Sequence, residues 1–259
     1  MTFGVIGRSV IRAHGDDAQK YLHSQLSNDI ASMAEGESRH SLLLEPTGRV
    51  VALLRVTRVG ATEFLIDFDD APDGTTFVET VLARLNRFRI RVKADFEVVP
   101  MSCVAFRDAT PPHVDGVTVP AWWLADGDVD VLTASVVDDL GNPDEIEYRR
   151  IEVGWPSMGR EIMPGETVPA ATGVVGVSVS FSKGCYPGQE LVERMDSRGS
   201  SAPRTLRRVT APAGVAAGDD VMVDGDVVGV YTSVADTPGC ALALVNRAVE
   251  LGEVVTRPE

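Results

Sequence analysis

The densest group of chemically useful side chains lies between Ser182 and Arg194, where the sequence reads SKGCYPGQELVER. Cys185 comes just before a predicted helix that begins near Gly188, and Lys183 stands two residues before the cysteine. The positive end of a helix and a nearby cation both favour the thiolate, which is the nucleophilic form of cysteine. The segment therefore predicts a nucleophilic or redox-active Cys185 assisted by Lys183, and its backbone N–H groups offer an anion site.

The same segment also has a purely structural interpretation. Strand–turn–helix junctions are common, and Glu190 and Arg194 have the i, i+4 spacing of an ion pair on a helix surface. The other cysteines, Cys103 and Cys240, stand in apolar strand patterns and are expected in the core or at a sheet edge. Because the three cysteines are widely separated and have no close histidine partners, we expect neither a disulfide framework nor a bound metal.

The octapeptide Lys183–Glu190 resembles the KGCYxGQE motif of the YgfZ family at every defined position. The likeness continues to Arg194 and to Arg198-Gly199. Weaker matches in the family's order span nearly the whole chain: Gly15–Ala18, Asn28-Asp29, Gly48-Arg49, Arg150–Gly154 with Pro156, Gly229–Ser233 and Ala241–Arg247. The resemblance implies a folate-binding relative of the glycine-cleavage aminomethyltransferase that is linked to assembly or repair of iron–sulfur enzymes.

The resemblance also implies a fold. It is an α+β, aminomethyltransferase-like arrangement in which three subdomains form a ring around a folate-sized opening. Residues 1–202 would form the folate-binding region from two intertwined α+β subdomains with a ferredoxin-like portion, the second subdomain covering about 41–100. Residues 203–259 would form a small antiparallel β-barrel.

Tetrahydrofolate or a derivative is the cofactor that the resemblance implies. Glu152 matches the carboxylate that holds the pterin in the aminomethyltransferases, and a carboxylate can accept two adjacent N–H donors in parallel. The other residues predicted to bind folate are Tyr186, Gln189, Glu190 and Arg194, and the predicted catalytic residues are Cys185 and Lys183.

The chain departs from the aminomethyltransferase pattern at the catalytic carboxylate. Val51 and Ala52 stand where that family places an Asp, so ordinary aminomethyl transfer lacks its charged group. The carboxylates that could replace it are Glu190, Asp29 and Asp67.

A second departure concerns the aromatic wall of the folate site. Arg8 and Ile146 stand where one branch of the family has tryptophans associated with folate. The p-aminobenzoyl ring then needs another apolar wall, for which Tyr186 and the pair Trp122-Trp123 are the candidates.

Three functions remain open from the sequence. The leading hypothesis is a cytoplasmic tetrahydrofolate-binding protein that supports iron–sulfur enzymes through the Cys185 loop, with folate and iron–sulfur client or assembly proteins as partners. The second is a folate-dependent one-carbon transferase that acts on a small amine. The third is a non-catalytic interaction module in which Lys183–Glu190 is only a structural clasp.

The elements that must position these residues follow from apolar periodicity and turn signals. Helices are expected at Asp16–Asn28 (with His23 in solvent), after a capping box at Thr76–Glu79, from Asn142 to Val153, and from about Gly188. Strands are expected at Ser41–Leu44, Val50–Val59, Glu63–Phe68, within Arg89–Phe106, at Trp122–Leu124, Val129–Leu132 and Val174–Phe181. After Pro203 the expected strands are Thr205–Thr210, Val221–Val223, Val227–Val234 and Ala241–Val245, with a tight hairpin at Asp224-Gly225.

Composition narrows the classes of partner. The 259 residues include 24 Lys and Arg against 38 Asp and Glu, which gives a formal charge of −14. Such an acidic chain is a poor general binder of nucleic acids or anionic membranes, so neither is expected as a partner. No apolar run reaches the roughly 18 residues of a membrane span, and the first residues lack a signal-peptide pattern. These features predict a cytoplasmic protein.

Overall fold

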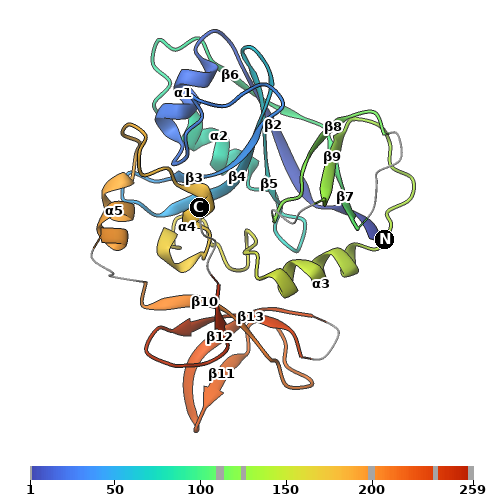
Figure 1. The fold of residues 1–259 in the computed structure, drawn as a ribbon, viewed down its shortest axis with the longest axis vertical. Helices are drawn as coiled ribbons and strands as arrows, with labels where there is room; N and C mark the ends of the chain where they lie inside the picture. The colour runs from blue at the N-terminus through green and yellow to red at the C-terminus, as the bar shows by residue number, and fades with distance from the viewer. Residues whose placement is uncertain (1, 109–113, 124–126, 198–201, 236–238, 256–259) are drawn as a thin grey trace.

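The computed structural model describes residues 2–108, 114–123, 127–197, 202–235 and 239–255 (Figure 1). Leu124 and Arg198-Gly199, which entered the sequence predictions, lie outside these ranges. Three antiparallel sheets with a few helices packed against them form the described part of the chain. The predicted α+β class is confirmed.

The first sheet contains most of the main core. Its strand order is β3-β4-β5-β2-β6. The strands are β2 (Arg8–His14), β3 (Ser38–Leu44), β4 (Val50–Gly60), β5 (Glu63–Asp69) and β6 (Asp95–Val99). Two helices, α1 (Ala18–Gln25) and α2 (Val78–Asn86), pack their apolar residues into the same core as the central strands. Burial of these aliphatic side chains is the main force that stabilises this half of the molecule.

The second sheet has the order β1-β7-β9-β8. Its strands are β1 (Thr2–Ile6), β7 (Ser102–Arg107), β8 (Val117–Pro120) and β9 (Val129–Thr133). Helix α3 (Pro143–Val153) packs beside β1 and lies between this sheet and the C-terminal strands (Figure 1). Its predicted start is confirmed, because the Asn142 side chain accepts a hydrogen bond from the Glu145 N–H at 3.1 Å. It ends where Gly154 takes the left-handed conformation (φ 75°).

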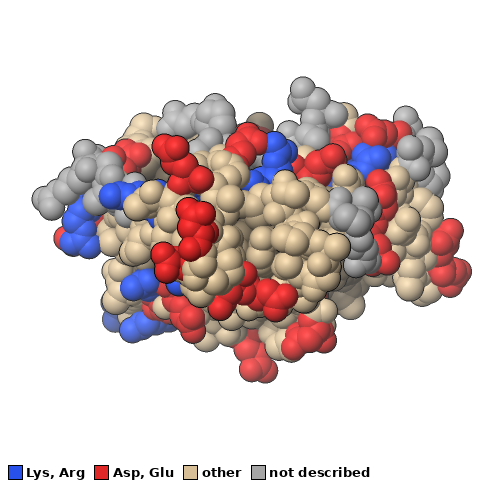
Figure 2. Space-filling model, turned by 90° about the horizontal axis from the view of Figure 1, so that it is seen from below, with Lys and Arg blue, Asp and Glu red and all other residues tan. Residues whose placement is uncertain are grey.

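The C-terminal strands form a separate antiparallel sheet in the order β11-β12-β13-β10-β14. They are β10 (Arg204–Val209), β11 (Asp220–Val223), β12 (Asp226–Val234), β13 (Ala241–Asn246) and β14 (Glu253–Val254). The predicted hairpin is confirmed, since Asp224 and Gly225 both have positive φ (52° and 92°). No pairing among the described strands joins β14 back to β11, so the structure records an open sheet where a barrel was expected. Acidic side chains are spread over this end of the molecule, where basic side chains are fewer (Figure 2).

Two predicted strands are wrong. The run Val174–Phe181 contains a short helix, α4 (Val175–Ser178), preceded by a 3-10 turn at Pro169–Ala171. A short apolar run does not distinguish a buried helix from a strand. Here the Ser178 N–H closes the helical turn on the Val174 carbonyl at 3.0 Å, and Ser178 Oγ donates to the same oxygen at 2.6 Å. Trp122 and Trp123 lie in a turn after β8 instead of in a strand. That turn is closed by the Ala121 N–H, which donates to the Asp128 carbonyl.

Several predicted boundaries also change. Helix α1 is shorter than Asp16–Asn28 because Leu26 is already extended and the Ser27 N–H pairs with Leu42 of β3. Helix α2 begins after Phe77, and Thr76 Oγ1 accepts from the N–H of Val78 instead of that of Glu79, so no capping box forms. The region Arg89–Phe106 divides into β6 and β7. The helix expected from about Gly188 is confirmed as α5 (Gln189–Ser197).

Membrane spans and metal clusters are both absent from the described ranges. No helix there is long and apolar enough to cross a membrane. No three His, Cys, Asp or Glu side chains of the described residues come together in a way that could hold a metal ion.

Candidate functional site

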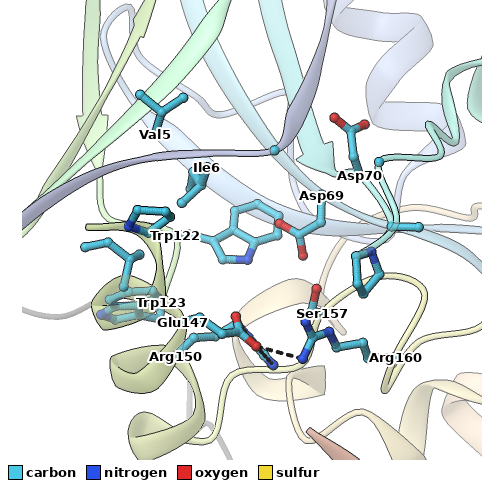
Figure 3. A pocket seen from close by; sticks show the side chains of 16 residues that line it. Val5, Ile6, Asp69, Asp70, Trp122, Trp123, Glu147, Arg150, Ser157 and Arg160 are labelled. Carbon is cyan, nitrogen blue, oxygen red and sulfur yellow. Dashed lines mark hydrogen bonds and ion pairs between the residues drawn. The ribbon is translucent and has the colours of Figure 1, made fainter. Parts of the chain in front are cut away.

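A cavity of about 350 Å³ opens where the first sheet, the second sheet and α3 meet (Figure 3). Five separate segments form its wall. They supply Val5 and Ile6 from β1, Asp69 and Asp70 from the end of β5, Trp122 and Trp123 from the turn after β8, Ile146, Glu147 and Arg150 from α3, and Ser157 and Arg160 from the loop that follows. The volume is within the range of about 300–1,000 Å³ that is usual for small-molecule sites.

The aromatic side of the cavity is formed by Trp122 and Trp123, which are 2% and 5% exposed. The guanidinium carbon of Arg8 lies 3.3 Å from the ring centroid of Trp122, and that of Arg107 lies 4.0 Å from the ring centroid of Trp123. These cation–π contacts fix both rings. The indole Nε1 of Trp122 is buried and has no hydrogen-bond partner among the described residues. The tryptophan pair, which the sequence offered as one of two possible aromatic walls, therefore lines the cavity.

A buried carboxylate, Asp69, faces the same cavity. Its side chain is 12% exposed and accepts hydrogen bonds from Arg8 and from the Met158 N–H. Burial is the largest influence and raises the pKa of Asp69 above its ordinary value, although Arg8 acts in the opposite direction. Sequence reasoning missed Asp69, whose only signal is its place as the last residue of a buried strand in the run Asp67-Phe68-Asp69-Asp70.

The floor of the cavity is an ion-pair cluster on α3. Glu147 accepts hydrogen bonds from Arg150 at 2.7 and 2.8 Å and forms an ion pair with Arg160 at 3.0 Å (Figure 3). Burial alone would raise the pKa of Glu147, but the two guanidinium groups lower it below its ordinary value. Arg150 also pairs with buried Glu161 at 3.1 Å and donates to Ser233 Oγ of β12 at 2.6 Å. The cluster thus ties the cavity to the C-terminal sheet.

Asp67, one of the carboxylates considered as a replacement for the missing catalytic Asp, belongs to a different buried network. It pairs with Arg8 at 2.7 Å and with Arg55 at 2.8 Å, and Arg55 continues to Asp130 of β9 at 2.5 Å. Asp67 is fully buried; burial raises its pKa, but the two arginines lower it below the ordinary value. This network joins the first and second sheets, and Asp67 does not line the cavity.

The octapeptide lies away from the cavity wall. Cys185 is an exposed free thiol, whereas Lys183 is half-buried. The Lys183 ammonium donates to the carbonyls of His23 and Leu26 at the C-terminal end of α1, and it lies 4.8 Å from the ring centroid of Tyr186. Burial lowers the pKa of Lys183 to about 8. Lys183 therefore anchors the loop to α1 and leaves Cys185 at the surface.

Four further residues that the sequence predicted to bind folate, in the octapeptide and in α5, do not line the cavity. Tyr186 is 6% exposed and belongs to the main core, and burial raises its pKa to about 12. Gln189 accepts from the Tyr186 N–H at 3.4 Å and donates to Glu193 at 2.6 Å. Glu190 and Arg194 are exposed on α5. None of the four lines the cavity.

Glu152 is also placed elsewhere. It is exposed, and it lines a separate hollow of about 380 Å³ with Arg208 and Glu253. The reason is helical geometry. Glu152 follows Arg150 by two residues on α3, so its side chain points about 200° around the helix axis from that of Arg150, which faces the cavity. The structure therefore separates Glu152 from the acids Asp69 and Glu147 that do line the cavity.

His23 and Asp29 lie close to the octapeptide. His23 Nδ1 is 3.2 Å from Asp29 Oδ1 and accepts from the Ala31 N–H, and its side chain is only 26% exposed, so the expectation of a solvated histidine is wrong. Burial and, second, Lys183 lower the pKa of His23. Asp29, another candidate for the missing acid, does not line the cavity.

Comparison with known proteins gives relatives in sequence and a neighbour in fold. No protein-family model matches the chain. A "tRNA-modifying protein YgfZ" of Enterobacter sp. (strain 638) is 27% identical over 226 residues, which cover 72% of this chain and 65% of that protein. An "Iron-sulfur cluster assembly factor IBA57 homolog, mitochondrial" of Cryptococcus neoformans is 26% identical over 242 residues, which cover 77% and 63%. The chain therefore spans slightly less than two thirds of the length of these two relatives.

One structural neighbour is the glycine cleavage system aminomethyltransferase T from Bartonella henselae. It superposes with a TM-score of 0.73 over 96% of this chain and 79% of that protein, at 16% sequence identity. The predicted aminomethyltransferase-like fold is confirmed.

Proposed function

Because this chain is related in sequence to YgfZ and IBA57 proteins and has the fold of an aminomethyltransferase, we propose that it is a tetrahydrofolate-binding protein that supports the assembly or repair of iron–sulfur enzymes. The name of the IBA57 relative supports the iron–sulfur part of the proposal, and the cavity supports the folate part. We propose a cytoplasmic location for this activity.

The residues of the cavity fit a reduced pterin. The pyrimidine half of a reduced pterin is flat and carries adjacent N–H donors on one edge, so it needs an apolar face and a carboxylate. Trp122 and Trp123 supply the apolar face, and Asp69 supplies a buried carboxylate. The unpartnered Nε1 of Trp122 offers a further donor to the heteroaromatic ring. This combination in one cavity is the observation that carries the proposal.

Each residue then has a defined role. Asp69 accepts the paired N–H donors of the pterin, and Arg8 behind it holds the carboxylate in place. The tryptophans exclude water and orient the ring. Tetrahydrofolate, when bound, supplies a carrier for one-carbon groups.

Cys185 is the proposed reactive group on the outer surface. Its thiol is exposed on a loop whose position is fixed by Lys183 and by the buried ring of Tyr186. A rigidly held, exposed thiol suits contact with an iron–sulfur client or assembly protein. Gln189, Glu190 and Arg194 would border that contact, because they belong to the adjoining helix α5.

Calorimetry with tetrahydrofolate under reducing, anaerobic conditions tests the folate part. Asp69→Asn should weaken binding by about tenfold or more, the equivalent of about 1.4 kcal/mol. Asp73→Asn, on the exposed loop that follows β5, should bind as the wild type does. Absence of binding by the wild type, or equal affinities of wild type and Asp69→Asn, would overturn the proposed folate site.

Complementation tests the thiol. In cells that lack the protein, Cys185→Ala should fail to restore iron–sulfur enzyme activity while keeping its tetrahydrofolate affinity, and Cys240→Ala should restore it. If Cys185→Ala restores the activity fully, the thiol has no chemical role, and the octapeptide is a structural clasp.

Asp69 also favours a second candidate function, a folate-dependent one-carbon transferase. It is a cavity carboxylate whose pKa is raised by burial, as is useful for a general acid or base. Asp69, instead of Glu190, Asp29 or Asp67, would replace the acid missing at Val51 and Ala52. Turnover of a small amine donor with tetrahydrofolate, lost in Asp69→Asn, would support this function, and absence of turnover in the wild type would exclude it for the donors tested.

A further inference from the structure

We propose that the cavity selects folates by the length of their glutamate tail and takes the monoglutamyl form. This inference rests on the proposed binding of folate. It is drawn from the distribution of charge around the cavity. The described lining offers one accessible cation, Arg160, and beyond it several acidic side chains.

The acids begin inside the cavity. Asp69, Asp70 and Glu147 line it, against two cations, Arg150 and Arg160. Arg150 is 5% exposed and is already shared between Glu147 and Glu161. It has little capacity left for a ligand.

Arg160 is the cation that a ligand can reach. Its side chain is 27% exposed, and its ion pair with Glu147 uses Nη1. A guanidinium has five N–H donors, so the rest of the fork can bind a second carboxylate. We assign Arg160 as the partner of the first glutamate of the tail.

Beyond Arg160 the surface becomes acidic. A second hollow of about 470 Å³ adjoins the cavity and shares Glu147 and Arg160 with it. Asp144 and Glu145, in the first turn of α3, line this hollow, and Arg160 is the one Lys or Arg in its described lining. The nearby Arg149 is engaged with Glu145 and Asp108.

On the other side of the cavity, the described lining offers no further Lys or Arg. The loop after β5, residues 70–75, carries Asp70 and Asp73 and no Lys or Arg. Each glutamate added to a folate tail adds one carboxylate, and that carboxylate meets like charge on either side. Repulsion between exposed charges extends over a Debye length of about 8 Å at 0.15 M salt, so it acts on the second and later glutamates.

Calorimetry with the full chain tests this selection by comparing tetrahydrofolate carrying one glutamate with the form carrying five. At about 0.02 M salt the monoglutamate should bind about tenfold more tightly, and at about 1 M salt the ratio should approach one, because the charges are then screened. The double variant Asp144→Asn/Glu145→Gln should reduce the low-salt ratio without changing monoglutamate affinity. The matched control Asp224→Asn/Asp226→Asn, at the β11–β12 hairpin, should leave the ratio unchanged.

Arg160→Gln tests the anchor separately. It should weaken monoglutamate binding several-fold and leave binding of a tail-free reduced pterin unchanged. Equal or tighter binding of the pentaglutamate by the wild type would overturn the tail-length inference and leave the proposed function intact. Failure of both folates to bind would instead overturn the proposed function.

Discussion

The guanidinium of Arg8 lies against the face of Trp122, 3.3 Å from its centroid, and the same guanidinium holds the carboxylates of Asp67 and Asp69. One buried side chain therefore positions both the aromatic wall and the acid of the cavity. By the sequence resemblance, Arg8 replaces a folate-associated tryptophan of one branch of that family. We propose that Trp122 supplies the aromatic surface instead, with Arg8 behind it.

Replacing Trp122 should affect both ligand binding and stability, because its ring belongs to the main core and also lines the cavity. Trp122→Phe keeps an aromatic ring but removes part of the stacking surface and the Nε1 donor, so tetrahydrofolate affinity should fall by about 0.5–1.5 kcal/mol, or about two- to twelvefold. Calorimetry measures this change. Trp155→Phe is the matched control, because Trp155 is equally buried, packs against Trp122 at 6.0 Å and does not line the cavity. Equal losses in both variants would show that Trp122 acts only through packing.

His40 should make the protein acid-sensitive. It is buried between Trp122 and Trp155, and burial, followed by Arg55 and Arg8, lowers its pKa to about 3. The pKa of His40 is therefore lower in the folded state than in the unfolded chain. His40 does not reduce the free energy of unfolding above about pH 6.5, where it is neutral in both states. As the pH falls from there towards 3, the unfolded chain binds the proton more readily and the free energy of unfolding decreases. Between pH 7 and pH 5 this loss should be about 2 kcal/mol.

Urea unfolding at several pH values measures that loss. His40→Phe cannot titrate, so its free energy of unfolding should fall less between pH 7 and pH 5 than that of the wild type. His14→Phe, at a half-exposed position in β2, serves as the control and should follow the wild type. If His40→Phe shows the same slope as the wild type, another group accounts for the acid sensitivity.

The two glycines of the octapeptide should respond differently to substitution. A Cβ on Gly188 would lie 2.6 Å from the Glu45 carbonyl oxygen and 3.0 Å from Gly48, and Gly188 has φ +87°. Gly188→Ala should therefore destabilise the fold by about 1–3 kcal/mol. Gly184 has no positive φ, and a Cβ added there would meet nothing within 4 Å, so Gly184→Ala should be within about 0.5 kcal/mol of the wild type. Thermal unfolding compares the two, and similar melting temperatures would contradict the packing of this loop on the β3–β4 turn.

Lys183 should contribute a distinct pH dependence of stability. Its folded-state pKa of about 8 is below its ordinary value because the ammonium is half-buried. The unfolded chain therefore binds more protons than the folded protein between about pH 8 and 10.5, and the Lys183 contribution to stability rises with pH over that interval. Lys183→Met should lose this rise, while Lys20→Met, at an exposed position on α1, should keep it. The measurement is the difference in unfolding free energy between wild type and variant at pH 8 and pH 10, and a constant difference would contradict the burial of the ammonium.

The sequence by itself determined the features that depend on local physics. The cap at Asn142, the turn at Asp224-Gly225 and the helix after Gly188 were all predictable, because neighbouring residues satisfy their backbone groups or set their backbone angles. The octapeptide was recognisable from its residues alone, and so was the likeness of fold that followed from it.

Tertiary structure decided what lines the cavity. Asp69, Trp122 and Arg160 are far apart in sequence and meet only because two sheets and α3 converge. Glu152 has the right chemistry for a pterin, yet its position on α3 turns it to the opposite side from Arg150. The apolar run before the octapeptide became the helix α4 because its apolar side chains are compatible with either a helix or a strand and its long-range packing selected the helix. Periodicity carries no information about such distant contacts, and for that reason the site could be located only in three dimensions.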